Sequence, residues 1–287
     1  MKKNDPKVLR AWTFYDWANS VYSLSITTAI FPIYYNSITS ANGSDEVTFL
    51  GRTFTNTALY SYALSFSFLV IAFLSPLLSG IADYKGNKKF FMRLFCFLGS
   101  ASCASLYFFK DLSSLDMGII SFILASIGWA GSIVFYNAFL PEIATADMQD
   151  KVSARGFALG YIGSSLLLIF NLAMILNPSW FGITNSGMAS RISFLMTGAW
   201  WFGFALFTFK YLPEKTSTHN TSQQLLTKGF NELLKVLKQL QSLPMLKRFL
   251  ISFFFYNKGV QTVMYVASLF GTKELHMRDD ELIITVL

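Results

Sequence analysis

An aspartate and an asparagine lie inside a long apolar segment near the start of the chain. Asp16, Asn19 and Ser23 recur at intervals of three and four residues, so they share one face of a helix, with Trp12 one turn below. Ionisable residues inside a membrane span are costly and mark sites that bind ions, protons or solutes. We therefore expect Asp16 to bind a proton or a substrate amine. The alternative is a carboxylate at the membrane surface, solvated by water.

A second polar group interrupts another apolar segment, residues 249–270, near its centre. The group consists of Tyr256, Asn257, Lys258 and Gln261. A lysine at this depth is expected to face a cavity or a carboxylate, because the membrane surface is about 12–15 Å away. The alternative is a long side chain that extends to that surface. The cavity interpretation makes all four residues candidate solute ligands.

Other polar residues within apolar segments are candidates for the same cavity. They are Tyr22, Asn137 and Tyr161. Gly156, Gly160 and Ser164 recur every four residues, a pattern that lets two helices approach closely, so we expect packing there rather than chemistry. Asn171 is expected to hydrogen-bond a neighbouring helix. Pro141 cannot continue a helical hydrogen-bond ladder, so a helix should end or kink there.

Charged residues gather in the short connections between apolar segments. One connection contains Asp83 at the end of an apolar run, Gly86 where a tight turn is needed, and Lys88 among further lysines. These lysines are expected to hold the loop in the cytoplasm. Glu142 and Arg155 flank another connection, and we expect them to pair across it.

The remaining reactive residue types argue against catalysis and against a metal site. Cys96 and Cys103 are seven residues apart, which is about 10 Å along a helix and too far for a disulfide. His219 and His276 share no ligand spacing. The sequence contains no Gly-rich phosphate loop and no serine beside a plausible histidine base. We expect no enzyme activity, no cofactor and no metal.

Composition and uncharged stretches indicate a membrane protein. Hydrophobic residues make up 53% of the 287 residues and charged residues 14%, against about 25% in a soluble domain. A helix crosses the bilayer with about 20 mostly apolar residues. Spans are predicted at 11–35, 57–80, 94–110, 117–139, 157–177, 192–211 and 249–270, and an eighth begins at Leu282. The expected fold class is all-α, a polytopic helical protein in a lipid bilayer.

The distribution of basic residues predicts the orientation. Segments 1–10, 85–93, 151–155 and 210–248 carry 17 of the 23 Lys and Arg residues, whereas the other connections carry five. Cytoplasmic loops retain basic residues, so we expect a cytoplasmic N-terminus, no cleaved signal peptide and a plasma (inner) membrane location. The same rule accounts for the net charge of +7 without a nucleic-acid partner.

A polar stretch divides the predicted spans into two groups. Residues 1–211 are predicted to form a six-helix half, 212–248 a cytoplasmic linker, and 249–287 the incomplete start of a second half. Within the linker, one helical face is apolar and consists of Leu226, Phe230, Leu233, Leu237 and Leu240. We expect this amphipathic helix to lie on the inner membrane surface, with partner binding as the alternative.

Several segments resemble known transporters. The loop with Asp83, Gly86 and Lys88 resembles the signature loop between spans 2 and 3 of the major facilitator superfamily, although Ser79 and Asn87 depart from its pattern. Longer matches resemble the vacuole-effluxer family of that superfamily, and they lie at 11–20, 31–35, 137–144, 155–163 and 256–263. A fungal member of that family is linked to amino-acid efflux from the vacuole.

The resemblance implies a secondary transporter that moves a small polar solute, such as an amino acid, by alternating access between two halves. The solute would bind between spans 1 and 7, with proton coupling at Asp16. Gating residues would be Asp83, Gly86, Lys88, Glu142 and Arg155. The family usually has an acidic residue at the position of Lys258, and a salt bridge from Lys258 to Asp16 would compensate for this change.

The length of the chain predicts that part of the transporter is missing. Twelve spans of about 20 residues, with their loops, need more than 287 residues. We therefore expect a fragment, whose solute pathway requires the missing C-terminal half or a second chain. The alternative class is a non-transporting membrane scaffold or sensor, or an inactive transporter fragment.

Overall fold

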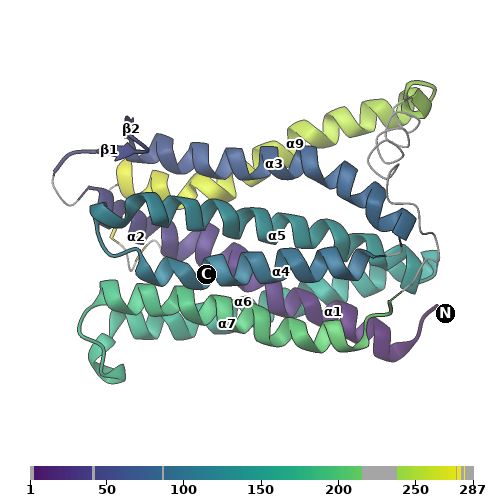
Figure 1. Ribbon diagram of the computed structural model, residues 1–287, viewed down its shortest axis with the longest axis horizontal. Coiled ribbons are helices and arrows are strands. Elements are labelled where there is room, and N and C mark those ends of the chain that lie inside the picture. Colours follow the sequence, from purple (N-terminus) through teal and green to yellow (C-terminus); the bar gives the residue numbers. More distant parts are fainter. Residues whose placement is uncertain are drawn as a thin grey trace.

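The computed structural model describes residues 3–40, 43–85, 87–214, 238–275, 277–278 and 281. It shows a bundle of long helices that run along a common axis (Figure 1). Most of the amphipathic helix predicted in the linker, and the predicted eighth span, lie outside the described residues.

The described helices coincide with the seven predicted spans. They are α1 (Pro6–Val21), η1 (Tyr22–Ala29), α2 (Ile30–Thr39), α3 (Asn56–Lys85), α4 (Lys88–Ser105), α5 (Leu115–Ile143), α6 (Ala146–Leu176), α7 (Ser186–Tyr211) and α9 (Pro244–Lys273). Three short 3-10 turns lie between them, η2 (Leu106–Phe108), η3 (Leu112–Ser114) and η4 (Pro178–Phe181). Among the described residues, five helices are long and apolar enough to cross a membrane, namely α3 to α7.

The first predicted span is not one regular α-helix, because the π-helical segment η1 separates α1 from α2. Pro32 has no N–H to donate to the preceding turn. The carbonyl of Thr27 instead accepts a hydrogen bond from the Tyr60 hydroxyl at 2.9 Å. The side chains of Thr27 and Thr28 both donate to the carbonyl of Ser23, at 2.6 and 3.0 Å. These bonds satisfy backbone groups that the irregular turn would otherwise leave unpaired.

A β-hairpin covers one end of the bundle. Strands β1 (Glu46–Phe49) and β2 (Arg52–Thr55) pair antiparallel, with Val47 opposite Phe54. The turn residues Leu50 and Gly51 both have positive φ, as a tight two-residue hairpin turn requires. We call this end, with Asp45 and the hairpin, the hairpin end. The opposite end, with Asn4, Glu142 and the start of α4, is the linker end (Figure 1).

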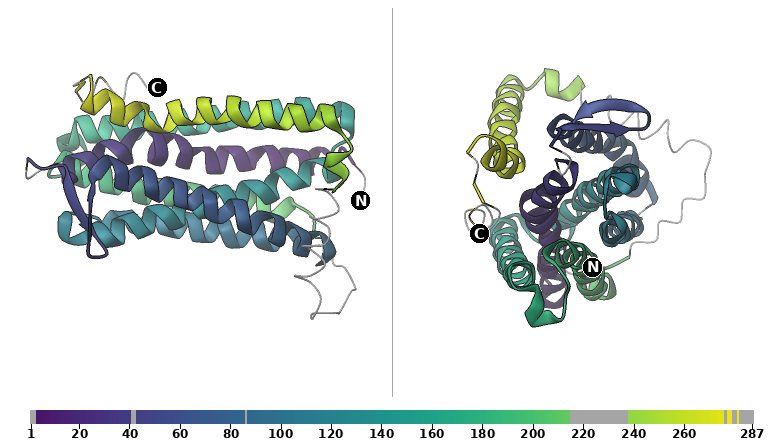
Figure 2. Two further views of the ribbon diagram at one scale, coloured as in Figure 1. Left: turned by 90° about the horizontal axis from the view of Figure 1, so that it is seen from above. Right: turned by 90° about the vertical axis from the view of Figure 1, so that its left-hand side faces the viewer.

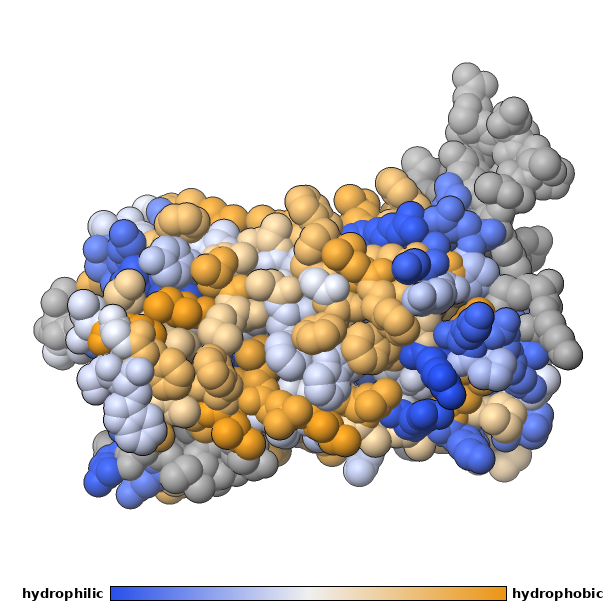
Figure 3. All heavy atoms as spheres, turned by 90° about the horizontal axis from the view of Figure 1, so that it is seen from below, coloured by the Kyte–Doolittle hydropathy of each residue, from blue (hydrophilic) through white to orange (hydrophobic). Residues whose placement is uncertain are grey.

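Helix packing places α1 at the centre of the bundle (Figure 2). It packs against α6 and α7, while α4 packs against α5 and α7, and α3 against α5. On the face shown in Figure 3, the surface between the two ends is mainly apolar and hydrophilic residues gather toward both ends. An apolar band with polar ends is the surface that a bilayer requires.

Glycine permits a close approach of two helix backbones where α4 crosses α5. A Cβ atom on Gly128 would clash with the backbone of Gly99 on α4, and a Cβ on Gly99 would clash with the Trp201 ring on α7. Cys96 and Cys103 are buried and unpaired on the same helix, as expected. Helix α5 continues through Pro141 and ends at Ile143, within one turn of the proline.

We predict that Gly128→Ala lowers the free energy of unfolding by about 1–3 kcal/mol or more, because its methyl group has only backbone to displace. Thermal unfolding in detergent would measure this. Gly203→Ala on α7 is the matched control, since a Cβ there meets nothing within 4 Å. Equal stability of the two variants would contradict the proposed close contact.

Candidate functional site

The Asp16 carboxylate is held by a tyrosine from another helix. The Tyr136 hydroxyl on α5 donates a hydrogen bond to Asp16 Oδ2 at 2.7 Å. Tyr136 is buried and Asp16 is half-buried. On this helix, the sequence pattern favoured Asn137 as a ligand and gave no role to Tyr136. Helical rotation decides which of two adjacent residues faces α1, and a single sequence does not determine that rotation.

Trp12 fixes the position of Tyr136. Its ring stacks on the Tyr136 ring, with centroids 4.2 Å apart and planes at 12°. Its indole N–H also donates to the Tyr136 carbonyl at 2.9 Å. Trp12 lies one turn below Asp16 on α1, as predicted, so the same helix supplies both the carboxylate and the platform that orients its partner.

Helix α6 closes the third side of this site. A Cβ on Gly156 would clash with Asp16 Oδ2, and a Cβ on Gly160 would approach Ser20 Oγ to 2.5 Å. Ser164 is buried one turn further along and donates to the Gly160 carbonyl at 2.7 Å. The prediction that this face serves close packing is therefore confirmed. The packing also brings the backbone of α6 directly against the carboxylate.

Two buried asparagines keep unpaired polar atoms. Asn19 is 2% exposed, and its Nδ2 has no hydrogen-bond partner among the described residues. Asn171 on α6 is fully buried, and neither its Nδ2 nor its Oδ1 has such a partner. The predicted hydrogen bond from Asn171 to a neighbouring helix is absent from the described contacts. Buried, unsatisfied amides are costly and are therefore available to a ligand or a water molecule.

The other predicted ligands on the first six spans do not converge on Asp16. Tyr22 is buried in the core, where its hydroxyl lies 2.8 Å from Ser126 Oγ and its ring lies between Trp129 and Trp201. Asn137 is exposed, and Tyr161 is 68% exposed. Of these three predicted ligands, one is therefore buried away from Asp16 and two are exposed.

The polar residues of α9 form a separate group. Asn257 and Gln261 are half-buried, whereas Lys258 is exposed and Tyr256 is 73% exposed. The Lys258 ammonium lies over the Phe254 ring, 5.8 Å from its centroid. The ion pairs between described residues do not include one from Lys258 to Asp16, so the hypothesised salt bridge is not formed.

Two of the predicted gating residues meet at the linker end. Lys88 Nζ lies 2.6 Å from Glu142 Oε1, and both side chains are partly buried. Glu142 was expected to pair with Arg155. Arg155 is exposed on α6 and makes no ion pair with a described residue. The start of α4 lies nearer to Glu142 than the expected partner does. Gly86 and the Asp83 side chain lie outside the described residues.

A second charged group at the linker end was missed. Arg93 Nη1 lies 2.8 Å from Glu214 Oε1, and Lys89 Nζ lies 3.5 Å from the same oxygen. Lys89 is buried and also donates to the Leu212 carbonyl at 2.7 Å. These contacts attach the segment after α7 to the start of α4. The sequence showed the basic residues but not that their acidic partner would be Glu214, just after the sixth span.

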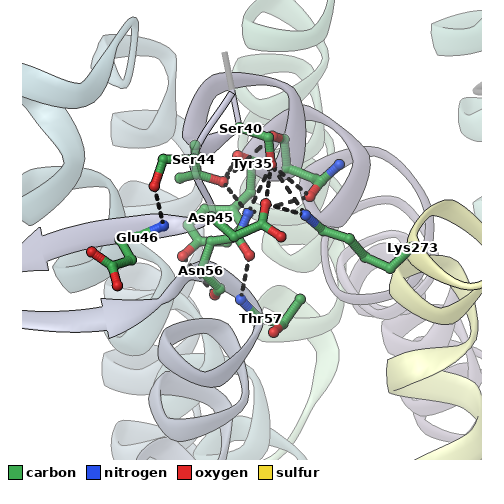
Figure 4. Close-up of polar contacts among 10 residues, drawn as sticks. Tyr35, Ser40, Ser44, Asp45, Glu46, Asn56, Thr57 and Lys273 are labelled. Carbon is green, nitrogen blue, oxygen red and sulfur yellow. Dashed lines mark hydrogen bonds and ion pairs between the residues drawn. The ribbon is translucent and has the colours of Figure 1, made fainter. Parts of the chain in front are cut away.

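A polar cluster at the hairpin end was also missed (Figure 4). The Lys273 ammonium on α9 forms an ion pair with Asp45 and donates to Ser40 Oγ at 3.2 Å. The hydrogen bond from Lys273 holds the pKa of the Asp45 carboxyl below its usual range. At Asp111, nearby hydroxyl and backbone donors from Ser113 and Ser114 likewise lower the pKa of the carboxyl.

The helices that surround Asp16 offer an ionisable carboxyl, a tyrosine hydroxyl and unpaired asparagine amides within an apolar bundle. Such groups suit the binding of a proton or of a small polar solute. Among the described residues, no group of three His, Cys, Asp or Glu side chains is placed to hold a metal ion.

Comparison with known proteins gives three informative matches. A family model described as "Vacuole effluxer Atg22 like" matches residues 4–150 and 144–287. The uncharacterized MFS-type transporter YxiO of Bacillus subtilis (strain 168) is 34% identical over 273 residues, which cover 95% of this chain and 62% of that protein. Autophagy-related protein 22 of Saccharomyces cerevisiae (strain ATCC 204508 / S288c) is 25% identical over 333 residues, with 94% of this chain and 62% of that protein covered. No solved structure matches.

These matches decide the family. The chain spans 62% of the length of both relatives, so both relatives are longer than this chain. The family model nevertheless matches almost every residue of the chain. The family is one of transporters, which confirms the expectation that the chain is not an enzyme. The chain is a polytopic helical membrane protein that belongs to the Atg22-like vacuole effluxer family of the major facilitator superfamily.

Proposed function

We propose that this chain is part of a secondary active transporter that moves a small polar solute, with amino acids as the first candidates, by alternating access. The observation that carries this proposal is the hydrogen bond between Tyr136 and the Asp16 carboxylate, deep among α1, α5 and α6. Membership of an effluxer family supports the proposal that the chain takes part in solute transport. In this proposal Asp16 exchanges a proton as the solute pathway changes sides.

The solute is proposed to bind beside Asp16, between α1 and α9. Asn19 offers an unpaired amide N–H there. From α9, the half-buried Asn257 and Gln261 are proposed as further ligands, with Tyr256 and Lys258 at the edge of the pathway. Tyr22 is proposed to shape the site through its packing, and Asn137 and Tyr161 to line the pathway. Small solutes with ammonium and carboxylate groups would match this mixture of donors and acceptors.

The proposed architecture is a six-helix half over 1–211, a linker over 212–248 and the start of a second half over 249–287. We assign the linker end to the cytoplasm and the membrane to the plasma (inner) membrane. Support for this orientation comes from Lys88, Lys89 and Arg93, which all lie at the linker end.

The orientation predicts the labelling, in intact cells, of variants that each carry one added cysteine. A membrane-impermeant maleimide should label Ser113→Cys at the hairpin end and leave Asp150→Cys at the linker end unlabelled. Both positions are exposed, and the native Cys96 and Cys103 are buried, so background labelling should be low. Labelling of Asp150→Cys alone would reverse the proposed orientation.

Loss of the carboxylate should abolish proton coupling. In vesicles containing the complete transporter of which this chain is proposed to be a part, we expect Asp16→Asn to remove the stimulation of labelled amino-acid uptake by a pH gradient, because an asparagine side chain does not exchange a proton at neutral pH. Tyr136→Phe removes one hydrogen bond to the carboxylate and should have a smaller effect in the same direction. The measurement compares initial uptake rates with and without the gradient.

Asp150→Asn is the control for this experiment, because it removes an exposed carboxylate that has no ion pair with a described residue. Its uptake should equal that of the unmodified chain. Uptake that is absent from every vesicle preparation, with correctly folded protein, would instead support the scaffold or sensor alternative. Gradient-driven uptake that survives Asp16→Asn would exclude Asp16 as the proton site.

The linker-end ion pair predicts a charge-exchange result. Lys88 and Glu142 are proposed to act in gating, together with Asp83, Gly86 and Arg155. Lys88→Glu and Glu142→Lys each replace this 2.6 Å ion pair with two like charges and should slow uptake. The double exchange restores an attractive pair and should recover more uptake than either single variant. A double variant as slow as the worse single one would argue against the pairing.

A further inference from the structure

Lys273 joins α9 to the connection between the first two spans. Its ammonium pairs with Asp45 and donates to Ser40 Oγ, and Ser40 in turn donates to Asp45 Oδ1 at 3.0 Å. The three polar groups therefore contact one another in a closed triangle (Figure 4). Ser40 ends α2 and Asp45 precedes the hairpin five residues later, whereas Lys273 at the end of α9 lies 228 positions from Asp45.

Further hydrogen bonds hold Asp45 and Ser40, the two residues that accept from Lys273. The Asn56 N–H donates to the Asp45 carbonyl at 2.8 Å, which closes the base of the hairpin. Asn56 Nδ2 donates to Ser40 Oγ and to Thr39 Oγ1, each at 3.0 Å. The Tyr35 hydroxyl donates to the Asn56 carbonyl at 2.8 Å. Asn56 and Tyr35 are buried, so this network presents Asp45 and Ser40 to α9 in a fixed position.

Helix α9 contacts the rest of the bundle mainly at this end. Its principal packing partners are η1 and α2. Among its described side chains, Leu269 is 4% exposed and Lys273 is half-buried, whereas residues 244–256 are all exposed. Figure 1 shows the C-terminal end of α9 beside α2 and its N-terminal end at the linker end of the bundle. The contact that attaches α9 to the first six spans is therefore concentrated at the hairpin end.

The charges of the contact suit a reversible attachment. The pKa of Asp45 is held below its usual range by the hydrogen bond from Lys273, so the carboxyl is charged at neutral pH. The Asp45 side chain is 55% exposed and that of Lys273 24%. An ion pair of this exposure shifts an equilibrium by at most about fivefold, which thermal motion and salt can overcome. The ion pair can therefore favour the attached arrangement of α9 over a detached one without making the attachment permanent.

We propose that Asp45, Ser40 and Lys273 form a gate that holds α9 against α2 and closes the hairpin side of the solute pathway. The gate rests on the proposed transporter function, because it regulates access to the site beside Asp16. When the gate breaks, the end of α9 moves away from α2 and the space along η1 opens toward the hairpin end. The polar face of η1 that includes Ser23 then becomes reachable from that side.

Cysteine accessibility tests the gate without requiring transport. The reporter is Ser23→Cys, a half-buried position on η1, treated with an impermeant maleimide from the side that labels Ser113→Cys. Asp45→Asn or Lys273→Gln should raise the labelling rate about two- to fivefold, as expected for an exposed ion pair. Ser40→Ala leaves the ion pair intact and should raise it less. The exchange Asp45→Lys with Lys273→Asp should restore slow labelling.

Two neighbouring charges supply matched controls. Glu46→Gln neutralises the residue after Asp45, and Lys110→Gln neutralises an exposed lysine at the same end. Among the ion pairs of the described residues, that of Lys273 is with Asp45 and not with Glu46. Both variants should label at the unmodified rate. About 1 M salt, which screens charges beyond about 3 Å, should speed the labelling of the unmodified gate but not of Asp45→Asn.

The outcomes separate the gate from the transport proposal. Unchanged labelling in Asp45→Asn and Lys273→Gln, with normal labelling of Ser113→Cys in the same background, would overturn the gate. The gate is also overturned if Glu46→Gln speeds labelling as much as Asp45→Asn does. Faster labelling, together with no amino-acid uptake by vesicles of the complete transporter, would retain the gate and reject the proposed transport.

Discussion

The close approach of α6 to α1 is the contact on which the candidate site depends. Lipid tails are as apolar as leucine side chains, so helices in a membrane associate through close packing and not through burial from water. Gly156 and Gly160 leave α6 no side chain toward α1, and the backbone of α6 lies against Asp16 and Ser20. Gly156 also leaves room for the Tyr136 hydroxyl, which donates to the Asp16 carboxylate and would lie 3.2 Å from a Cβ at that position. A packing motif thereby determines where the chemistry can occur.

The π-helical segment η1 divides the first span into two parts with different contacts. Segment η1 contacts α6, α7 and α9, so it lies where several helices meet. Single π-helical turns inside α-helices are frequent at functional sites, because they rotate the side chains that follow and disturb the regular hydrogen-bond ladder. Here Tyr60 from α3 compensates the disturbed ladder at Thr27. The interruption separates the part of the span that carries Asp16 from the part that approaches the end of α9.

Local sequence patterns predicted the helices well and the contacts between them poorly. The uncharged stretches located every described span, and the four-residue repeat of small residues identified the packing face of α6. Tyr136 was missed in favour of Asn137, since adjacent residues differ only in helical phase. Asp45 and Lys273 lie 228 positions apart, and no local pattern relates a loop to a helix at that distance. The η1 segment was missed because its residues are ordinary helix-compatible types.

The two ends of the bundle differ in how their charges are connected, and this difference bears on alternating access. At the linker end, the described ion pairs join α4 to α5 and to the segment after α7, within the first six spans. At the hairpin end, the ion pair crosses from that unit to α9. Separating α9 at the linker end therefore breaks none of the described ion pairs. Separating α9 at the hairpin end breaks the ion pair between Lys273 and Asp45, beside the hydrogen-bond network of Asn56. In the proposed gate, opening at the hairpin end therefore begins with the loss of the ion pair between Lys273 and Asp45.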